Sequence, residues 1–278
     1  MEHSLDSARD KLRRADAHFD ALHAEAGAWL DSHPYEIFPV EQDAWFEEAL
    51  HFEMHIGVVQ APPWELGLIF GDVLHNLRGV LDHLFWELVT RRGTPTWNEA
   101  RTISFPIART YRTFSEWPGI KSFRQRPKGQ PRSTWRPDPP GRNRVTYSER
   151  LAIQRHQPYK RKDTANHPLA ALREMNDRDK HQAFHPLLVS VEEPAPKFLV
   201  SDGKIVESSY RYGEPLTEGA HIADVWVADY GPNVDVQVDS LAVAIAFGDT
   251  SQITIRRLGA IRQEVAEVLA EFVTAFPP

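Results

Sequence analysis

Apolar residues recur every three or four positions through residues 4–31, 62–92, 166–184 and 251–276, which predicts four long helices. Residues 34–59 instead alternate apolar and polar positions and predict two strands. The same alternation predicts strands at residues 102–107, 187–191, 197–201, 204–212, 221–228, 234–239 and 241–247, and a short helix fits residues 148–156. We therefore predict an α+β fold, with a bundle of about four helices packed with an antiparallel β-sheet in one domain over residues 1–278.

The helix predicted at residues 62–92 has an unusual polar face. A solvated helix face usually consists of Lys and Glu, whereas this one holds Asp72, His75, Asn76, Arg78, Gly79, Asp82 and His83. A glycine inside a helix costs about 1 kcal/mol relative to alanine. We interpret this polar face as a candidate functional site. The helix at residues 166–184 carries a second group of polar residues, and the two groups meet if the helices are neighbours: Asn176, Asp177, Asp179, Lys180 and His181.

Composition narrows the class of protein. The 278 residues include no cysteine, which excludes disulfides, thiolate metal sites and a cysteine nucleophile. No apolar run reaches the eighteen or so residues of a membrane span, and the charged start of the chain does not resemble a signal peptide. We therefore expect a soluble cytoplasmic protein without membrane contact.

Positive charge is concentrated in one proline-rich segment, which we interpret as an insertion or loop over residues 121–165. Residues 121–163 hold thirteen Lys and Arg against three acidic residues, although the whole chain has a net charge of −7. Aromatic residues are interleaved with the arginines, as in surfaces that bind nucleic acid. The expected nucleic-acid-binding residues are Arg142, Arg144, Lys160 and Arg161. A loop that only contacts the protein's own acidic surface is the alternative.

Arg78 and His83 are separated by four residues on the candidate helix. This spacing resembles the R-x4-6-H motif of the HEPN superfamily, whose helical domains include metal-independent endoribonucleases that act on RNA at a dimer interface. By this resemblance, His83 is expected to transfer protons and Arg78 to stabilise the charge on the phosphate. Four further residues are expected to complete the catalytic site: Asn76, Asp82, Lys180 and His181. The resemblance implies an RNA-cleaving homodimer without a cofactor, and a toxin or phage-defence role follows by analogy.

The stretches HNLRGVLDHL and HPLAALREMNDRDKHQ, with the QPY before the second, also resemble a family of uncharacterised bacterial and phage proteins. Those proteins carry an HNLR-x-x-LDHL helix and a later N-x-x-DKH helix. The resemblance implies no function. It does group nine residues into one expected cluster: His75, Asn76, Arg78, Asp82, His83, Asn176, Asp179, Lys180 and His181.

Other interpretations of these residues stay open. The cluster can be a buried polar network that fixes helix packing, in a non-catalytic protein that binds nucleic acid or a protein partner through the basic segment. In a metal-dependent hydrolase, the expected ligands are instead His75, Asp82, His83 and His181. His51, Glu53 and His55 share one face of a predicted strand at a spacing suited to a metal. We favour an exposed strand face there, because no third ligand is evident nearby.

Overall fold

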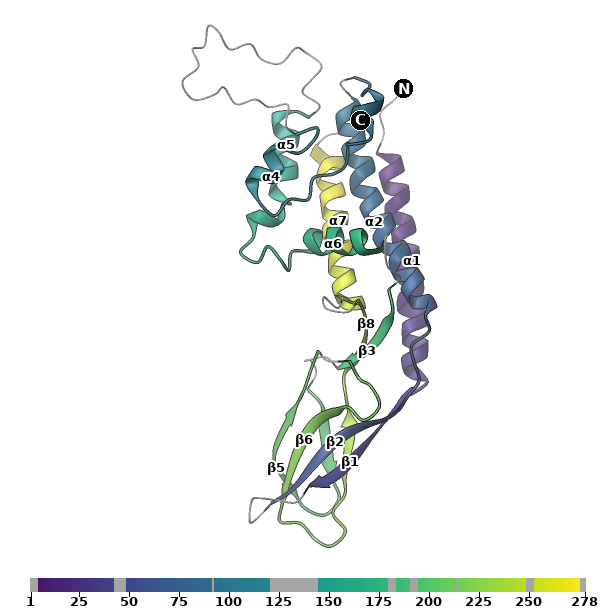
Figure 1. Cartoon of the computed structure of the whole chain (residues 1–278), viewed down its shortest axis with the longest axis vertical. Coiled ribbons are helices and arrows are strands. Elements are labelled where there is room, and N and C mark those ends of the chain that lie inside the picture. The colour runs from purple at the N-terminus through teal and green to yellow at the C-terminus, as the bar shows by residue number, and fades with distance from the viewer. Residues whose placement is uncertain are drawn as a thin grey trace. The chain divides into compact units, whose positions relative to one another are not determined.

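The computed structural model describes residues 5–42, 49–91, 93–120, 145–179, 184–190, 195–213, 215–248 and 253–275 (Figure 1). They form two compact units: a helical unit drawn from residues 1–20, 69–183 and 256–278, and a β unit drawn from residues 21–68 and 184–255. The predicted α+β class is confirmed. A single domain over residues 1–278 stays a prediction, and most of the 121–165 insertion lies outside the described residues.

The four long helices predicted from periodicity are present. They are α1 (Asp6–Asp31), α2 (Glu65–Thr90), α6 (Pro168–Asp179) and α7 (Ile255–Ala275). The short helix predicted at residues 148–156 is α5 (Tyr147–Arg155). Three elements are too short for periodicity to predict: α3 (Trp97–Ala100), α4 (Tyr111–Ser115) and the 3-10 turn η1 (Pro158–Lys160). Within the described residues, no helix is both long and apolar enough to cross a membrane.

The core of the helical unit is built on the apolar faces of α2 and α7. The buried residues of α2 include Val73, Leu77, Val80, Leu81, Leu84 and Leu88. Those of α7 include Leu258, Ile261, Val265, Val268 and Phe272. Burial of each such side chain contributes about 1.5–3 kcal/mol to the stability of the unit. α1 is joined to α7 through Arg262, which donates to Asp16 at 2.6 Å and lies over the ring of Phe19.

A histidine also links α5 to α7. Both ring nitrogens of His156 contact carboxylates of α7, Nδ1 at 3.1 Å from Glu264 and Nε2 at 2.7 Å from Glu271. Burial lowers the pKa of His156, but the hydrogen bonds and charges of the two glutamates raise it above its ordinary value overall. The hydrogen bond from His156 correspondingly lowers the pKa of Glu264. His156 and Glu264 therefore stabilise each other in their charged forms.

The strands of the β unit pair only antiparallel among the described residues. Sheet A has the order β1-β2-β6-β5, formed by β1 (Tyr35–Gln42), β2 (Ala49–Val59), β6 (His221–Ala228) and β5 (Lys204–Tyr210). Sheet B contains β3 (Pro186–Ser190), β8 (Val243–Phe247) and β9 (Ile253–Thr254), and sheet C contains β4 (Lys197–Val200) and β7 (Val236–Ser240). Apart from β9 these strands match the predicted ones to within about two residues.

One face of sheet A forms the core of the β unit. Phe52, Met54 and Ile56 of β2 are buried together with Val225 and Val227 of β6. Because side chains alternate along a strand, the residues between them lie on the other face. That second face carries the histidines and carboxylates of β2 and β6.

Residues 102–107 do not form the predicted strand. Buried backbone groups need hydrogen-bond partners, and here side chains supply them in place of a neighbouring strand. The buried amide of Gln157 accepts from the backbone N–H of Ala108 at 2.9 Å and donates to the carbonyl of Pro106 at 2.8 Å. The indole of Trp117 donates to the carbonyl of Ser104 at 2.9 Å. We call residues 104–108 the clamped segment.

Candidate functional site

The polar face of α2 borders a cleft of about 360 Å³ in the helical unit. The cleft is lined by His75, Arg78, Gly79, Asp82, Ser104, Trp117, Arg173, Asn176 and Asp177. The polar groups predicted on α2 and α6 therefore meet in part. Four residues of the α2 group line the cleft, together with Asn176 and Asp177 of the α6 group. Of the nine residues in the expected cluster, His75, Arg78, Asp82 and Asn176 line the cleft, so the cluster as a whole stays a prediction.

Arg78 is fixed by internal partners. Its Nε and Nη2 donate to the two oxygens of Asp82 at 3.0 and 2.7 Å, and Nη2 also donates to the carbonyl of Phe105 at 3.0 Å. Asp82 in turn accepts from the backbone N–H of Phe105 at 2.8 Å. The ion pair thus holds the clamped segment against α2. Nη1 of Arg78 takes part in none of these four hydrogen bonds.

Arg173 of α6 also lines the cleft, although the sequence analysis did not select it. Its Nη1 donates to the carbonyl of Ile107 at 2.7 Å, and its guanidinium lies 5.4 Å from the centre of the Trp117 ring. The sequence did indicate Arg173 as a neighbour of the predicted polar residues, because it lies three residues before Asn176 and four before Asp177. That spacing puts all three on one face of α6.

His75 is exposed at the cleft, and Asp179 of α6 lies close by. Burial raises the pKa of the Asp179 carboxyl; the charge of His75 opposes this increase and that of Asp72 adds to it. The two helices approach closely here. A Cβ built on Gly71 would lie 2.6 Å from Oδ1 of Asp179, so an alanine here would displace the Asp179 carboxylate.

His83 does not share the cleft with Arg78. Its Nδ1 lies 2.5 Å from Oγ of Ser7, in a second pocket of about 450 Å³. This pocket is lined by Ser7, Asp82, His83, Trp86, Glu87 and Ile103. Asp82 borders both pockets, whereas Arg78 lines the first and His83 the second. The expected pocket shared by Arg78 and His83 is therefore not found, because residues five apart on a helix point about 140° apart around its axis.

The other predicted residues fall into three groups. Asn76 is buried and donates to the carbonyl of Asp72 at 2.8 Å within its own helix, which is a structural role. Lys160 and Arg161 are exposed at the end of the basic segment, and Lys160 lies over the ring of Tyr159. Four predicted residues lie outside the described residues: Arg142, Arg144, Lys180 and His181. For the metal alternative on α2, His75 and His83 face different pockets.

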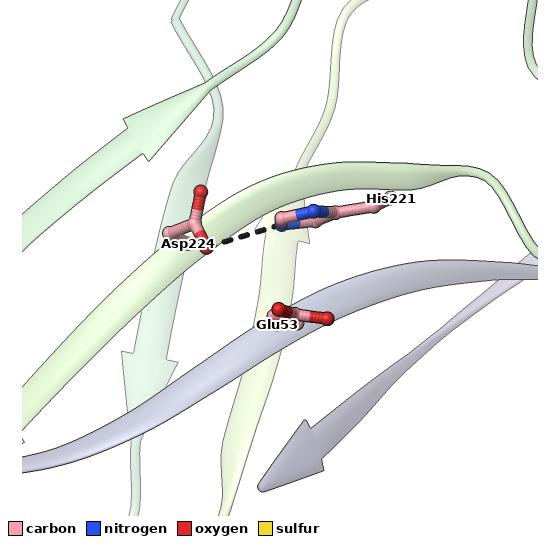
Figure 2. A group of neighbouring side chains, drawn as sticks. All are labelled: Glu53, His221 and Asp224. Carbon is pink, nitrogen blue, oxygen red and sulfur yellow. Dashed lines mark ion pairs between the residues drawn. The ribbon is translucent and has the colours of Figure 1, made fainter. Parts of the chain in front are cut away.

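A separate polar cluster lies on sheet A. Figure 2 shows Glu53 of β2 beside His221 and Asp224 of β6, whose metal-binding atoms lie within 4.8 Å of one another. His221 Nε2 is 3.1 Å from Asp224 Oδ1. His51 and His55 belong to the same face, with hydrogen bonds of 2.9 Å to Asp224 and Glu53 respectively. The polar face of β2 is therefore extended by His221 and Asp224 of β6, which the analysis of β2 alone did not find.

An irregularity in β6 explains why the sequence analysis missed this cluster. With strict alternation, His221 and Asp224 would lie on opposite faces of the sheet. The register instead pairs Met54 with Ala223 and His55 with His221, which leaves Ile222 as an extra residue. Ile222 and Ala223 are both buried, so this bulge turns His221 to the face of Asp224. In the sequence, the adjacent apolar residues Ile222 and Ala223 interrupt the alternation and indicate this irregularity.

Comparisons of the chain with protein-family models, with curated proteins and with solved structures found no match. The cleft beside α2 and the cluster on sheet A are therefore the basis for assigning a function.

Proposed function

We propose that the helical unit is a metal-independent endoribonuclease whose active site is the cleft beside α2. The observation that carries this proposal is that one open cleft is lined by the imidazole of His75, the guanidinium of Arg78 and the carboxylate of Asp177. Cleavage of RNA by its own 2′-hydroxyl requires a base for the hydroxyl proton, an acid for the leaving 5′-oxygen and a cation near the phosphate. The cleft offers a side chain for each of these roles.

The arrangement suggests a role for each group. Asp177 of α6 accepts the proton of the 2′-hydroxyl, and His75 of α2 protonates the 5′-oxygen as the phosphodiester bond breaks. Arg78 stabilises the charge that develops on the phosphate through Nη1. Its guanidinium is already oriented by Asp82 and the clamped segment, so little reorganisation is needed during the reaction.

The charge distribution supports RNA as the substrate. Lys160 and Arg161 are exposed in the helical unit and belong to the segment with thirteen Lys and Arg against three acidic residues. Such a concentration of positive charge attracts a polyanion and accelerates its association at low salt. Action as a homodimer stays a prediction from the resemblance to HEPN domains.

The test uses a 5′-labelled RNA of mixed sequence in the presence of EDTA. We expect products that end in a 2′,3′-cyclic phosphate, and no cleavage where the 2′-hydroxyl is replaced by hydrogen. His75→Gln and Asp177→Asn should each lower the rate about 100-fold, a usual value for the loss of a general acid or base. The matched control is His83→Gln, which removes an imidazole of the same helix from the second pocket and should change the rate less than twofold.

Each contrary result has a specific meaning. If His83→Gln abolishes cleavage and His75→Gln does not, the R-x4-H pair is the catalytic pair and the cleft is not the active site. If the chain binds RNA without cutting it, and charge reversal at Lys160 and Arg161 removes binding, the protein is a non-catalytic RNA-binding protein. Cleavage that needs added metal would refute the proposed mechanism.

A further inference from the structure

The cluster on sheet A brings two like charges together. Glu53 and Asp224 are direct partners across the paired strands β2 and β6, and their side chains are only 27% and 17% exposed. Like charges directly opposite in a sheet destabilise it, and partial burial strengthens the repulsion because the local dielectric constant is low. A cation bound between the two carboxylates offsets this repulsion.

We propose that Glu53, His221 and Asp224 bind one divalent transition-metal ion on the outer face of sheet A. Their ligand atoms lie within 4.8 Å of one another, and His221 Nε2 is 3.1 Å from Asp224 Oδ1. Ligands bound to Zn²⁺ at 2.0–2.2 Å are about 3.4 Å apart in a tetrahedron. Small side-chain movements are therefore enough for all three to reach one ion (Figure 2).

Neighbouring residues orient the two carboxylates before an ion arrives. His51 Nε2 is 2.9 Å from Asp224 Oδ1, and Ser209 donates to Asp224 Oδ2 at 3.2 Å. His55 lies between Glu53 Oε2 at 2.9 Å and the carbonyl of Gly219 at 3.1 Å. Metal sites regularly have such a second layer of hydrogen bonds, and its loss typically lowers affinity about 10- to 100-fold.

The donor atoms indicate the class of metal. One imidazole nitrogen and two carboxylate groups suit Zn²⁺, Mn²⁺ or Fe²⁺, and the absence of cysteine from the sequence excludes a thiolate site for Cu⁺. The bulge at Ile222 is the feature that makes the set complete, because it turns His221 to the face of the carboxylates. This inference is independent of the proposed ribonuclease cleft, which needs no metal.

The first experiment measures binding of Zn²⁺ and Mn²⁺ to the full chain by titration calorimetry, after removal of metal with EDTA and without a histidine tag. We expect one equivalent to bind. Glu53→Gln, His221→Gln and Asp224→Asn should each lower affinity about 100-fold or more, and His51→Gln about 10- to 100-fold. The matched control is Glu207→Gln on β5, an exposed glutamate of the same sheet, which should bind as the wild type does.

The second experiment separates a metal site from a hydrogen-bond network that only holds the strands together. If the carboxylates form a metal site, metal-free Glu53→Gln should melt at or above the wild-type temperature, because the repulsion is gone, while Zn²⁺ no longer raises its melting point. A lower melting temperature of metal-free Glu53→Gln, with no effect of Zn²⁺ on the wild type, would overturn the proposal. So would metal binding that is lost in His75→Gln and kept in His221→Gln.

Discussion

Replacing Asp82 by alanine tests how the clamped segment is held. The change removes the two hydrogen bonds from Arg78 and the one from the backbone N–H of Phe105. Hydrogen bonds to charged groups contribute about 1.5–3 kcal/mol, and breaking a buried ion pair on one side costs about 3–5 kcal/mol. Because Arg78 is 14% and Asp82 34% exposed, we expect a loss of about 3 kcal/mol in the free energy of unfolding.

For a chain of this size that loss corresponds to a decrease of about 6–12 °C in melting temperature, measurable by circular dichroism. The control is Glu116→Ala, which breaks another i,i+4 pair whose partners, Arg112 and Glu116, are 87% and 58% exposed. It should lower the melting temperature by no more than about 3 °C. Arg78→Met combined with Asp82→Ala should recover part of the loss, because no charge is then left unpaired. A melting temperature of Asp82→Ala within about 2 °C of the wild type would refute the reasoning.

Further predictions concern His156 and two glycines inside helices, Gly71 and Gly27. Because the pKa of His156 is raised above 6.5 in the folded chain, its charged imidazole stabilises the fold fully below pH 6.5, and this contribution is lost as the pH rises through the raised pKa. The two α7 glutamates, Glu264 and Glu271, have pKa values lowered from 4.5 and therefore stabilise the fold above pH 4.5. Between these limits both partners are charged, so His156→Gln should lower the free energy of unfolding by about 2 kcal/mol at pH 5.5 and by clearly less at pH 9. Urea unfolding measures both values. Gly71→Ala should gain less than the roughly 1 kcal/mol expected of alanine inside a helix, because its Cβ displaces the Asp179 carboxylate, whereas Gly27→Ala, with nothing within 4 Å, should stabilise α1 by up to about 1 kcal/mol in the same assay.

The elements with a clear period were predictable from the sequence. The stripe of Val73, Leu77 and Val80 on α2 predicts both the helix and its buried face, and the alternation through Phe52 and Met54 predicts β2. These patterns report burial directly, because each residue's direction follows from the regular geometry of its element. α2 and α6 both line one cleft, but only four residues of the expected cluster do so: His75, Arg78, Asp82 and Asn176.

The failures occur where the direction of a side chain depends on contacts distant in the sequence. The spacing of Arg78 and His83 suggested one site, but the cleft is also lined by Ser104, Trp117 and Arg173, which periodicity does not connect to α2. His221 was missed because one extra residue in β6 reverses its direction. Residues 102–107 look like a strand, yet their hydrogen-bond partners are side chains rather than another strand.

The clamped segment has a consequence for synthesis of the chain on the ribosome. Its backbone groups find their partners in Gln157 and Arg173, which are separated from Pro106 and Ile107 by 51 and 66 residues. Closing such long loops is slow and requires that α5 and α6 have already emerged. A nascent chain that ends before residue 157 therefore lacks the partners of Pro106, Ile107 and Ala108, and in pulse-labelling hydrogen exchange the amide of Ala108 should gain protection after those of α2.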